Sequence, residues 1–252
     1  MRAIILAAGR GSRLGGLTAD LPKALLPVEG EDSLLDLSLA ALAAAGVARV
    51  SLVVGFAAEK IRARLAARPA PLRVDFIDNP HWAETGSVAS LLLALEEPLD
   101  PWTLVVESDL LYHPDFPRRA LAQRRDTILV ADATGSGDEV WILADGAGRL
   151  TLLGKRIPPG RRGEAVGEFA GISLFSRELL QIYRVRAQAM LAAGAATGHY
   201  EELVFDIAQT ERPVSVLHLP GLPWTEVDNA ADLDRARGAV WPRLRPPETR
   251  GL

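Results

Sequence analysis

The chain has 252 residues, of which 48% are hydrophobic, and a formal net charge of −4. This size predicts one α/β domain with a substantial core, and the scattered Lys and Arg residues argue against a nucleic-acid partner. The absence of cysteine excludes a disulfide framework and a thiolate metal site. No apolar run approaches about 18 residues, and Arg10 and Arg13 interrupt the first one, so we expect a cytoplasmic protein with no signal peptide and no membrane insertion.

A buried strand is predicted at 4–6, and it leads into a glycine-rich loop. Gly9 and Gly11 free the backbone to bring N–H groups close to an anion. The dinucleotide fingerprint and the Walker loop are excluded, because Leu14 and Leu17 replace a required glycine and lysine. Three cations lie on the same loop: Arg10, Arg13 and Lys23. The pattern predicts a polyphosphate cradle, and a strand and turn without a ligand is the alternative.

Two segments of this region, LAAGRGSRL (6–14) and PKALLP (22–27), resemble the signature of nucleotidyltransferases that make NDP-sugars and CDP-alcohols. Members of that family transfer a nucleoside monophosphate from an NTP to a phosphate or phosphonate acceptor and release pyrophosphate. The resemblance implies that Arg13 and Lys23 are catalytic and neutralise the triphosphate. It also implies a nucleotide-binding loop composed of Leu6, Ala7, Ala8, Gly9, Arg10, Gly11 and Ser12.

Strands and helices alternate over the next segments of the chain. Helices are predicted at 33–45 and 57–67, and strands at 50–54 and 72–77, with Ser33 as the first N-cap. Strand–helix–strand alternation with short connections produces parallel sheets. We therefore expect an α/β fold with a Rossmann-like, mostly parallel sheet and helices on both faces, which the resemblance extends to a nucleotide-diphospho-sugar transferase-like fold.

A polar loop at 78–87 precedes a helix predicted at 87–95, which Thr85 or Ser87 would cap. Open α/β sheets bind ligands in loops of this kind, at the ends of strands. Trp82 in this loop either touches a ligand or packs the loop. The family has an Asn-Pro loop here, near the nucleotide base, and the resemblance implies nucleotide contacts for Asn79, Thr85, Gly86 and Ser87.

A buried strand predicted at 103–106 ends in the residues Glu107, Ser108 and Asp109. A carboxylate at the end of a buried strand is costly unless a cation meets it, and Mg²⁺ takes carboxylate and phosphate oxygens together. The alternative is that Asp109 caps the next turn. In the resembled family this aspartate binds the metal, and the resemblance implies a nucleotide contact for Ser108 and an acceptor contact for Glu107.

Strands at 127–131, 140–143 and 150–153, the last two joined by a glycine turn, predict a small antiparallel excursion. The segments SGDEV (136–140) and GEFAGI (167–172) resemble elements of the aminoethylphosphonate cytidylyltransferase branch. The resemblance implies that Lys155 is catalytic, at the acceptor or the α-phosphate. It implies acceptor contacts for Asp138, Trp141 and Glu168.

Helices are predicted at 177–191 and 199–208, before a strand at 214–217. Tyr200 and Glu202 offer the aromatic face and the carboxylate that an amine or trimethylammonium group needs. Aromatic core packing is the alternative for Tyr200.

The segment WTEVDNAADL (224–233) contains a predicted capping box between Asn229 and Asp232. It resembles the family's pattern for a second metal aspartate, which implies that Asp228 joins Asp109 as a ligand. The resemblance also implies that Glu226 supports the metal ligands and is an acceptor contact. We expect a single domain at 1–240 and a C-terminal tail at 241–252.

Together the motifs imply a Mg²⁺-dependent cytidylyltransferase that transfers CMP from CTP to 2-aminoethylphosphonate. Phosphocholine and a sugar 1-phosphate stay open as acceptors, and a non-catalytic nucleotide-sensing domain stays open as another class. The expected partners are CTP and a small phosphonate or phospho-alcohol, and a homodimer is left open.

Overall fold

The computed structural model describes residues 1–245. The strands are β1 (Arg2–Ala7), β2 (Pro27–Glu29), β3 (Asp32–Ser33), β4 (Arg49–Val54), β5 (Arg73–Asp78), β6 (Trp102–Glu107), β7 (Leu110–Tyr112), β8 (Thr127–Ala131), β9 (Trp141–Ala144), β10 (Leu150–Gly154), β11 (Ala165–Ser176), β12 (Ser215–His218) and β13 (Trp224–Glu226). The α-helices are α1 (Leu34–Ala44), α2 (Ala58–Ala67), α3 (Ser87–Ala94), α4 (Asp115–Gln123), α5 (Arg177–Ala192), α6 (Tyr200–Thr210), α7 (Ala230–Arg235) and α8 (Trp241–Leu244). Shorter helical turns are η1 (Ser12–Thr18), η2 (Lys23–Leu25), η3 (Arg162–Glu164) and η4 (Ala236–Val240).

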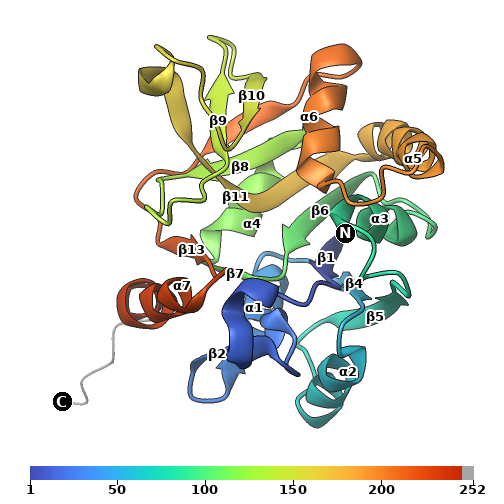
Figure 1. Ribbon diagram of the computed structural model, residues 1–252, viewed down its shortest axis with the longest axis vertical. Coiled ribbons are helices and arrows are strands. Elements are labelled where there is room, and N and C mark those ends of the chain that lie inside the picture. The colour runs from blue at the N-terminus through green and yellow to red at the C-terminus, as the bar shows by residue number, and fades with distance from the viewer. Residues whose placement is uncertain (246–252) are drawn as a thin grey trace.

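A large mixed sheet forms the centre of the molecule, with its main path in the order β10-β9-β11-β6-β1-β4-β5 (Figure 1). The strands β6, β1, β4 and β5 run parallel, as predicted. The antiparallel part is larger than a hairpin, because the long strand β11 runs antiparallel to β6, β8 and β9. The predicted α/β class is confirmed, and the predicted excursion is one part of this antiparallel half.

The register of the parallel strands decides where a ligand can bind. Every residue of β1 is buried, as expected for a central strand with neighbours on both sides. Leu6 in β1 pairs with Val53 in β4 and with Glu107 in β6. The glycine loop and the acidic segment that follows β6 therefore leave the sheet at the same edge.

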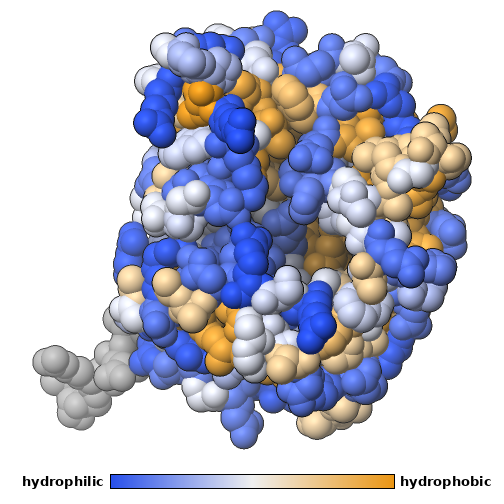
Figure 2. All heavy atoms as spheres, viewed as in Figure 1, coloured by the Kyte–Doolittle hydropathy of each residue, from blue (hydrophilic) through white to orange (hydrophobic). Residues whose placement is uncertain are grey.

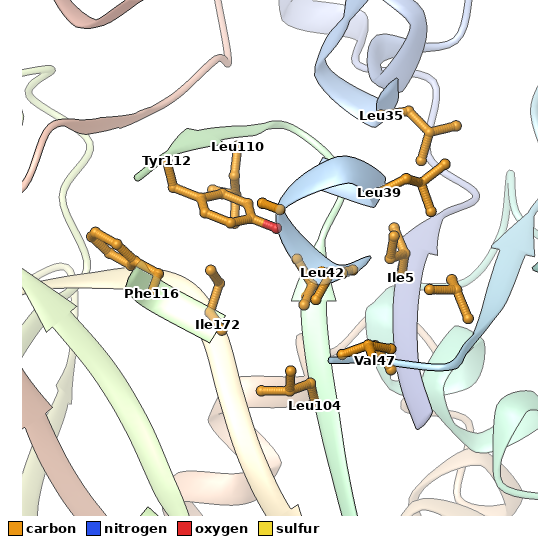
Figure 3. Close-up of a cluster of buried hydrophobic side chains, with 14 of the residues drawn as sticks. Ile5, Leu35, Leu39, Leu42, Val47, Leu104, Leu110, Tyr112, Phe116 and Ile172 are labelled. Carbon is orange, nitrogen blue, oxygen red and sulfur yellow. The ribbon is translucent and has the colours of Figure 1, made fainter. Parts of the chain in front are cut away.

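Helices cover both faces of the sheet, as predicted. On one face, α1 and α4 bury Leu35, Leu39 and Phe116 against strand residues such as Ile5 (Figure 3). On the other face, α3, α5 and α6 pack through residues that include Leu91, Leu179, Tyr183 and Leu203. Each helix buries one apolar face, which is the arrangement that the helical spacing indicates.

The helix caps agree with the sequence at α1 and differ at α3. Ser33 caps α1, because its hydroxyl accepts from the Asp36 N–H at 3.2 Å and the Asp36 carboxylate accepts from the Ser33 N–H at 2.9 Å. The N-cap of α3 is Gly86, so the predicted capping by Thr85 or Ser87 is wrong. The Thr85 hydroxyl instead donates to the His81 carbonyl, and the Ser87 hydroxyl accepts from the Tyr200 N–H.

The predicted tail starts as ordered structure. Residues Trp241–Leu244 form α8, and Trp241 and Leu244 pack against a small core that includes Leu26 and Leu233. Residues 246–252 of the predicted tail lie outside the described residues, and the single domain at 1–240 stays a prediction. Among the helices of residues 1–245, none has both the length and the apolar character needed to cross a bilayer.

Candidate active site

A cleft opens where β1 and β6 end, and the face drawn in Figure 2 is hollowed near its centre, with hydrophilic residues around the hollow. The cleft combines the glycine loop, the loop before α3, the segment after β6 and the segment after β13. Its lining consists of Leu6, Ala8, Gly9, Gly11, Ser12, Arg13, Lys23, Trp82, Thr85, Gly86, Ser87, Ser90, Glu107, Ser108, Asp109, His199, Glu226 and Asp228. Most of the residues predicted for the nucleotide thus lie in one place.

The glycine loop has the geometry of an anion cradle. Gly11 has φ 67°, a conformation that favours glycine, and a Cβ atom added there would make a tight contact of 3.1 Å with the Cβ of Lys23. The Thr18 hydroxyl donates to the Gly11 carbonyl at 2.8 Å and holds the loop. Within residues 1–245, no hydrogen bond uses the N–H groups of Gly9, Arg10 or Gly11. These donors remain available for an anionic ligand.

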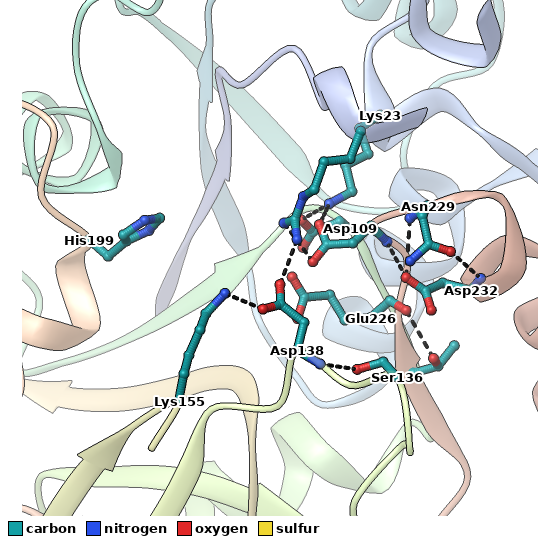
Figure 4. Close-up of polar contacts among 12 residues, drawn as sticks. Lys23, Asp109, Ser136, Asp138, Lys155, His199, Glu226, Asn229 and Asp232 are labelled. Carbon is teal, nitrogen blue, oxygen red and sulfur yellow. Dashed lines mark hydrogen bonds and ion pairs between the residues drawn. The ribbon is translucent and has the colours of Figure 1, made fainter. Parts of the chain in front are cut away.

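Lys23 joins the two aspartates that the sequence predicted to converge. Its Nζ atom donates to Asp109 Oδ2 at 2.6 Å and to Asp228 Oδ1 at 2.5 Å (Figure 4). Burial by itself would lower the pKa of Lys23, but the two carboxylates outweigh it and raise the pKa above its usual value. Lys23 is therefore a buried ammonium with a fixed position at the mouth of the glycine loop.

The pairing of β7 with β13 brings these aspartates together. Leu110 lies opposite Glu226 in this two-stranded sheet, and the Val227 N–H donates to the Asp109 carbonyl at 2.9 Å. Asp228 then precedes α7, where the predicted capping box of Asn229 and Asp232 is confirmed. The Asp232 carboxylate also accepts from the Asp228 N–H at 3.0 Å, which fixes Asp228 at the start of the helix.

A group of carboxylates beside Lys23 has the composition of a divalent metal site. Carboxylate oxygens of Glu107, Asp109 and Glu226 all lie within 4.8 Å of one another. Asp109 Oδ1 is buried and has no hydrogen-bond partner within the described part of the chain. Burial and the neighbouring carboxylates raise the pKa of Glu107 well above its usual value and that of Glu226 to about 9. A hard cation with oxygen ligands would satisfy the unpaired oxygen and relieve this crowding, so the residues fit such an ion.

Asp228, predicted as a metal ligand, lies in the cleft but is not one of these three mutually close carboxylates. Its oxygens contact Lys23 and Arg13, the latter at 2.7 Å. The residues that complete a cluster with Asp109 are Glu107, predicted as an acceptor contact, and Glu226, predicted as a supporting metal ligand and an acceptor contact. Both predicted ligands are therefore in the cleft, but the set of mutually close carboxylates differs.

A second ion-pair network links Arg13 to Lys155 through Asp138. Asp138 accepts from Arg13 Nη1 and from Lys155 Nζ, each at 2.5 Å (Figure 4). These two partners hold the pKa of Asp138 below its usual value, with Lys155 contributing most. Lys155 does not line the cleft; it borders a neighbouring cavity together with Trp141. Asp138 and Lys155 are thus connected to the cleft by the ion pair between Asp138 and Arg13, which lines it.

The loop before α3 owes its shape to Asn79. The buried Asn79 amide donates to the hydroxyls of Thr85 and Ser90, both at 3.1 Å, and its carbonyl accepts from the His81 N–H. Asn79 therefore orders the loop and does not line the cleft, unlike its neighbours Thr85, Gly86 and Ser87. Trp82 both lines the cleft and packs edge-on against Phe56, with ring centroids 5.3 Å apart.

Several predicted contact residues point elsewhere. Ala7 is buried in β1, and the Arg10 guanidinium lies over the Phe56 ring. The buried Glu168 carboxylate accepts from the Thr134 N–H at 2.6 Å. Tyr200 is completely buried, in agreement with the alternative of aromatic core packing. The Glu202 carboxylate accepts from the backbone N–H of His199, the N-cap of α6. We do not retain direct ligand contacts for these residues.

Two cleft residues were absent from the predicted set. Ser90 lies on α3, and His199 is the N-cap of α6, with its Nδ1 atom 3.9 Å from Glu201 Oε1. In the sequence, His199 is marked by its position alone: it follows the alanine- and glycine-rich segment 192–198 and begins a predicted helix. Gly55 was also overlooked, although a Cβ atom there would overlap the Trp82 side chain.

A family model described as the MobA-like NTP transferase domain matches residues 3–204. A CMP-5'-(3-aminopropyl)phosphonate synthase of Streptomyces rubellomurinus is 29% identical over 244 residues, which is 94% of this chain and 38% of that protein. A 2-aminoethylphosphonate cytidylyltransferase of Lancefieldella rimae is 28% identical over 234 residues, which is 92% of this chain and 89% of that protein. The chain thus spans less than half the length of the first relative and most of the second.

Two solved structures share the fold. A CTP:phosphocholine cytidylyltransferase from Streptococcus pneumoniae has a TM-score of 0.76 and 23% identity, and the match covers 94% of this chain and 97% of that chain. An inositol-1-phosphate CTP transferase from T. maritima has a TM-score of 0.73 and 20% identity, with 95% and 97% covered. At these identities the likeness establishes the fold.

Proposed function

Because the chain belongs to the MobA-like NTP transferase domain family, we propose that it transfers CMP from CTP to a small phosphonate or phospho-alcohol and releases pyrophosphate. The acceptor that we favour is 2-aminoethylphosphonate. The names of two relatives that match over 94% and 92% of this chain support both the nucleotide and the class of acceptor.

One observation carries the proposal. Lys23 holds Asp109 and Asp228 together at 2.6 Å and 2.5 Å, directly beside a glycine loop whose N–H groups are available. A buried cation, acidic residues and free amide donors at one strand edge are the parts that phosphoryl and nucleotidyl transfer need. This arrangement disfavours the alternative of a strand and turn without a ligand, because such a turn needs neither a buried cation nor free amide donors.

In the proposed reaction an anionic oxygen of the acceptor attacks the α-phosphorus of CTP. The new bond joins this oxygen to the α-phosphorus, the bond from the α-phosphorus to the bridging oxygen breaks, and that oxygen leaves with pyrophosphate. The acceptor is already ionised, so no general base is required. The chain contributes by positioning the two reactants and by stabilising the charge on the phosphates through Lys23, Arg13 and the loop amides.

Mg²⁺ is part of the proposal, and Glu107, Asp109 and Glu226 would hold it. A bound Mg²⁺ would neutralise phosphate charge and orient the phosphate oxygens. Lys23 holds Asp109 in position beside this cluster and links it to Asp228, because its ammonium contacts both.

An acceptor that bears an amine agrees with the charge of the cleft. Glu107, Asp109, Glu226 and Asp228 line it, and the cations on its lining are Arg13 and Lys23. Ionised carboxylates of this lining that do not hold Mg²⁺ would favour a ligand with a positive end besides the phosphates. Phosphocholine shares this property, whereas a sugar 1-phosphate does not.

The proposal can be tested by measuring pyrophosphate release from CTP and MgCl₂ with each of three acceptors: 2-aminoethylphosphonate, phosphocholine and glucose 1-phosphate. We expect the highest kcat/KM with 2-aminoethylphosphonate and little turnover when UTP, ATP or GTP replaces CTP. The Asp109→Asn variant is the control for contaminating activity. CTP binding without turnover on any acceptor would favour a nucleotide-sensing domain instead.

A further inference from the structure

A second cavity, with a volume of about 810 Å³, lies at the opposite edge of the central sheet from the catalytic cleft. Trp102, the first residue of β6, lines this cavity, and Glu107, the last residue of the same strand, lines the cleft. Six residues in a strand span roughly 16–20 Å. The two sites are therefore separate, and a ligand in one cannot contact the other.

Four arginines dominate the lining of the second cavity: Arg124, Arg125, Arg149 and Arg212. Arg149 pairs with Asp145 at 2.9 Å, and Arg212 pairs with Asp126 at 2.5 Å. The remaining two, Arg124 and Arg125, form no ion pair with any residue of 1–245.

The acidic residues at this cavity offset only part of its positive charge. Asp126 is buried and already accepts from the Ser176 N–H at 2.6 Å and the Ser176 hydroxyl at 3.1 Å, besides Arg212. Glu178 is the other acidic residue of the lining. Four guanidinium groups thus face three carboxylates, those of Asp126, Asp145 and Glu178, and the ion pairs go to Arg149 and Arg212.

The backbone at Arg124 adds a second observation. Arg124 ends α4 with φ 49° and ψ 38°, a left-handed conformation that glycine or asparagine adopts at lower cost. An arginine at this position, beside Arg125, whose guanidinium donates within the described residues only to the neutral Gln123 side chain at 3.2 Å, presents two adjacent guanidinium groups to one cavity. A planar guanidinium with several donors matches phosphate oxygens in pairs.

We propose that this cavity is a second binding site, for a small polyanion that carries two or more phosphate groups. Adjacent arginines suit neighbouring phosphates better than a single one, and the cavity has room for such an anion. A long nucleic acid is disfavoured, because the chain as a whole has a net charge of −4.

Inorganic tripolyphosphate is a suitable probe, and calorimetric titration of the full chain without divalent metal counts its sites. We expect two sites in the unmodified chain and one in Lys23→Ala, which impairs the catalytic cleft. Combining Lys23→Ala with Arg124→Gly and Arg125→Ala should weaken the remaining site at least tenfold, since each arginine supplies charge-assisted hydrogen bonds. Glycine at 124 relieves the backbone, so this variant should stay folded.

The matched control is Lys23→Ala with Arg118→Ala and Arg119→Ala. It removes the same number of charges from α4, the helix that precedes Arg124, at two arginines that pair with Asp115. This control should bind tripolyphosphate as Lys23→Ala does. The proposal is overturned if Lys23→Ala retains no site, or if both triple variants bind equally. Binding of a long RNA with tripolyphosphate unable to compete would also overturn it.

Discussion

Lys23 is the residue on which the proposed chemistry depends most. It is only 8% exposed, yet it stays charged because two carboxylates contact its ammonium at 2.6 Å and 2.5 Å. A charge that the fold holds in place before the substrate arrives needs no reorganisation during the reaction, which is why such groups contribute strongly to catalysis.

Replacing Lys23 by alanine should lower kcat by roughly 10²-fold or more, since the variant loses a preorganised positive charge at the phosphates. The measurement is pyrophosphate release at saturating CTP. Lys60→Ala is the control, because Lys60 is a surface lysine that pairs with Asp20. A thermal melt of each variant separates catalysis from unfolding. Unchanged kcat in a folded Lys23→Ala variant would contradict the role.

Glu168 makes a prediction about stability and pH. Burial raises its pKa from 4.5 to about 7, although Thr134 donates two hydrogen bonds to the carboxylate. The folded state therefore holds the proton more tightly than the unfolded state does. The resulting stabilisation is complete below about pH 4.5 and is lost as the pH rises through about 7, at about 1.36 kcal/mol per pKa unit and so up to about 3 kcal/mol.

Glutamine mimics the protonated acid, so Glu168→Gln should remove this dependence. We expect the Tm of the variant, relative to the unmodified chain, to rise by several degrees between pH 5 and pH 8, at roughly 2–4 °C per kcal/mol for a chain of this size. Melting curves at four pH values check this. A difference in Tm that stays constant with pH would show that Glu168 does not titrate in this range.

At the scale of elements, the segment between β8 and β9 does not line the cleft, but its Asp138 pairs with a cation that does, Arg13. Its Asp138 engages both Arg13 and Lys155 at 2.5 Å. A triphosphate bound in the cleft would compete with Asp138 for Arg13, which lines it. The ion pairs are largely exposed, so their strength should be modest, about 0.2–1 kcal/mol each.

Asp138→Asn should therefore lower the KM for CTP by up to about fivefold, the factor that corresponds to about 1 kcal/mol. Initial rates at varied CTP and a fixed acceptor concentration give this value. Asp115→Asn, which removes an equivalent surface carboxylate from α4, should leave the KM unchanged. A higher KM for the acceptor in Asp138→Asn, with the KM for CTP unaltered, would instead support the acceptor contact predicted from the sequence.

For the whole molecule, the position of β13 next to β7 is the decisive arrangement. It carries Glu226 and Asp228 from the end of the chain to the acidic segment that follows β6. The lining of the resulting cleft holds four carboxylates and two cations, Arg13 and Lys23. Such an imbalance at one strand edge is stable only when a cation joins it or when some groups stay protonated.

Removing divalent metal with EDTA should thus abolish turnover, and MgCl₂ should restore it while KCl does not. MgCl₂ should also raise the Tm of the chain without nucleotide, because an ion that binds the folded state stabilises it. The Asp109→Asn variant should lose this rise in Tm. Full turnover in EDTA, or an equal Tm shift in Asp109→Asn, would contradict the metal site.

Local patterns in the sequence were sufficient for most of the elements and for the cradle. The buried strand before Gly9, the capping boxes at Ser33 and Asn229, and the alternation of strands and helices all depend on residues within a few positions of one another. Backbone conformation and capping are decided at that range. The motifs also placed Lys23, Asp109 and Asp228 correctly in one cleft.

Tertiary structure alone decided which polar groups meet. The pairing of β7 with β13 joins segments far apart in the chain, and it selected Glu107 and Glu226 as the carboxylates nearest to Asp109. The packing of β11 and α6 buries Glu168 and Tyr200, and neither lines the cleft. A polar residue in a sequence indicates that a partner is needed, but the partner's identity depends on strand order and register, which local spacing does not contain.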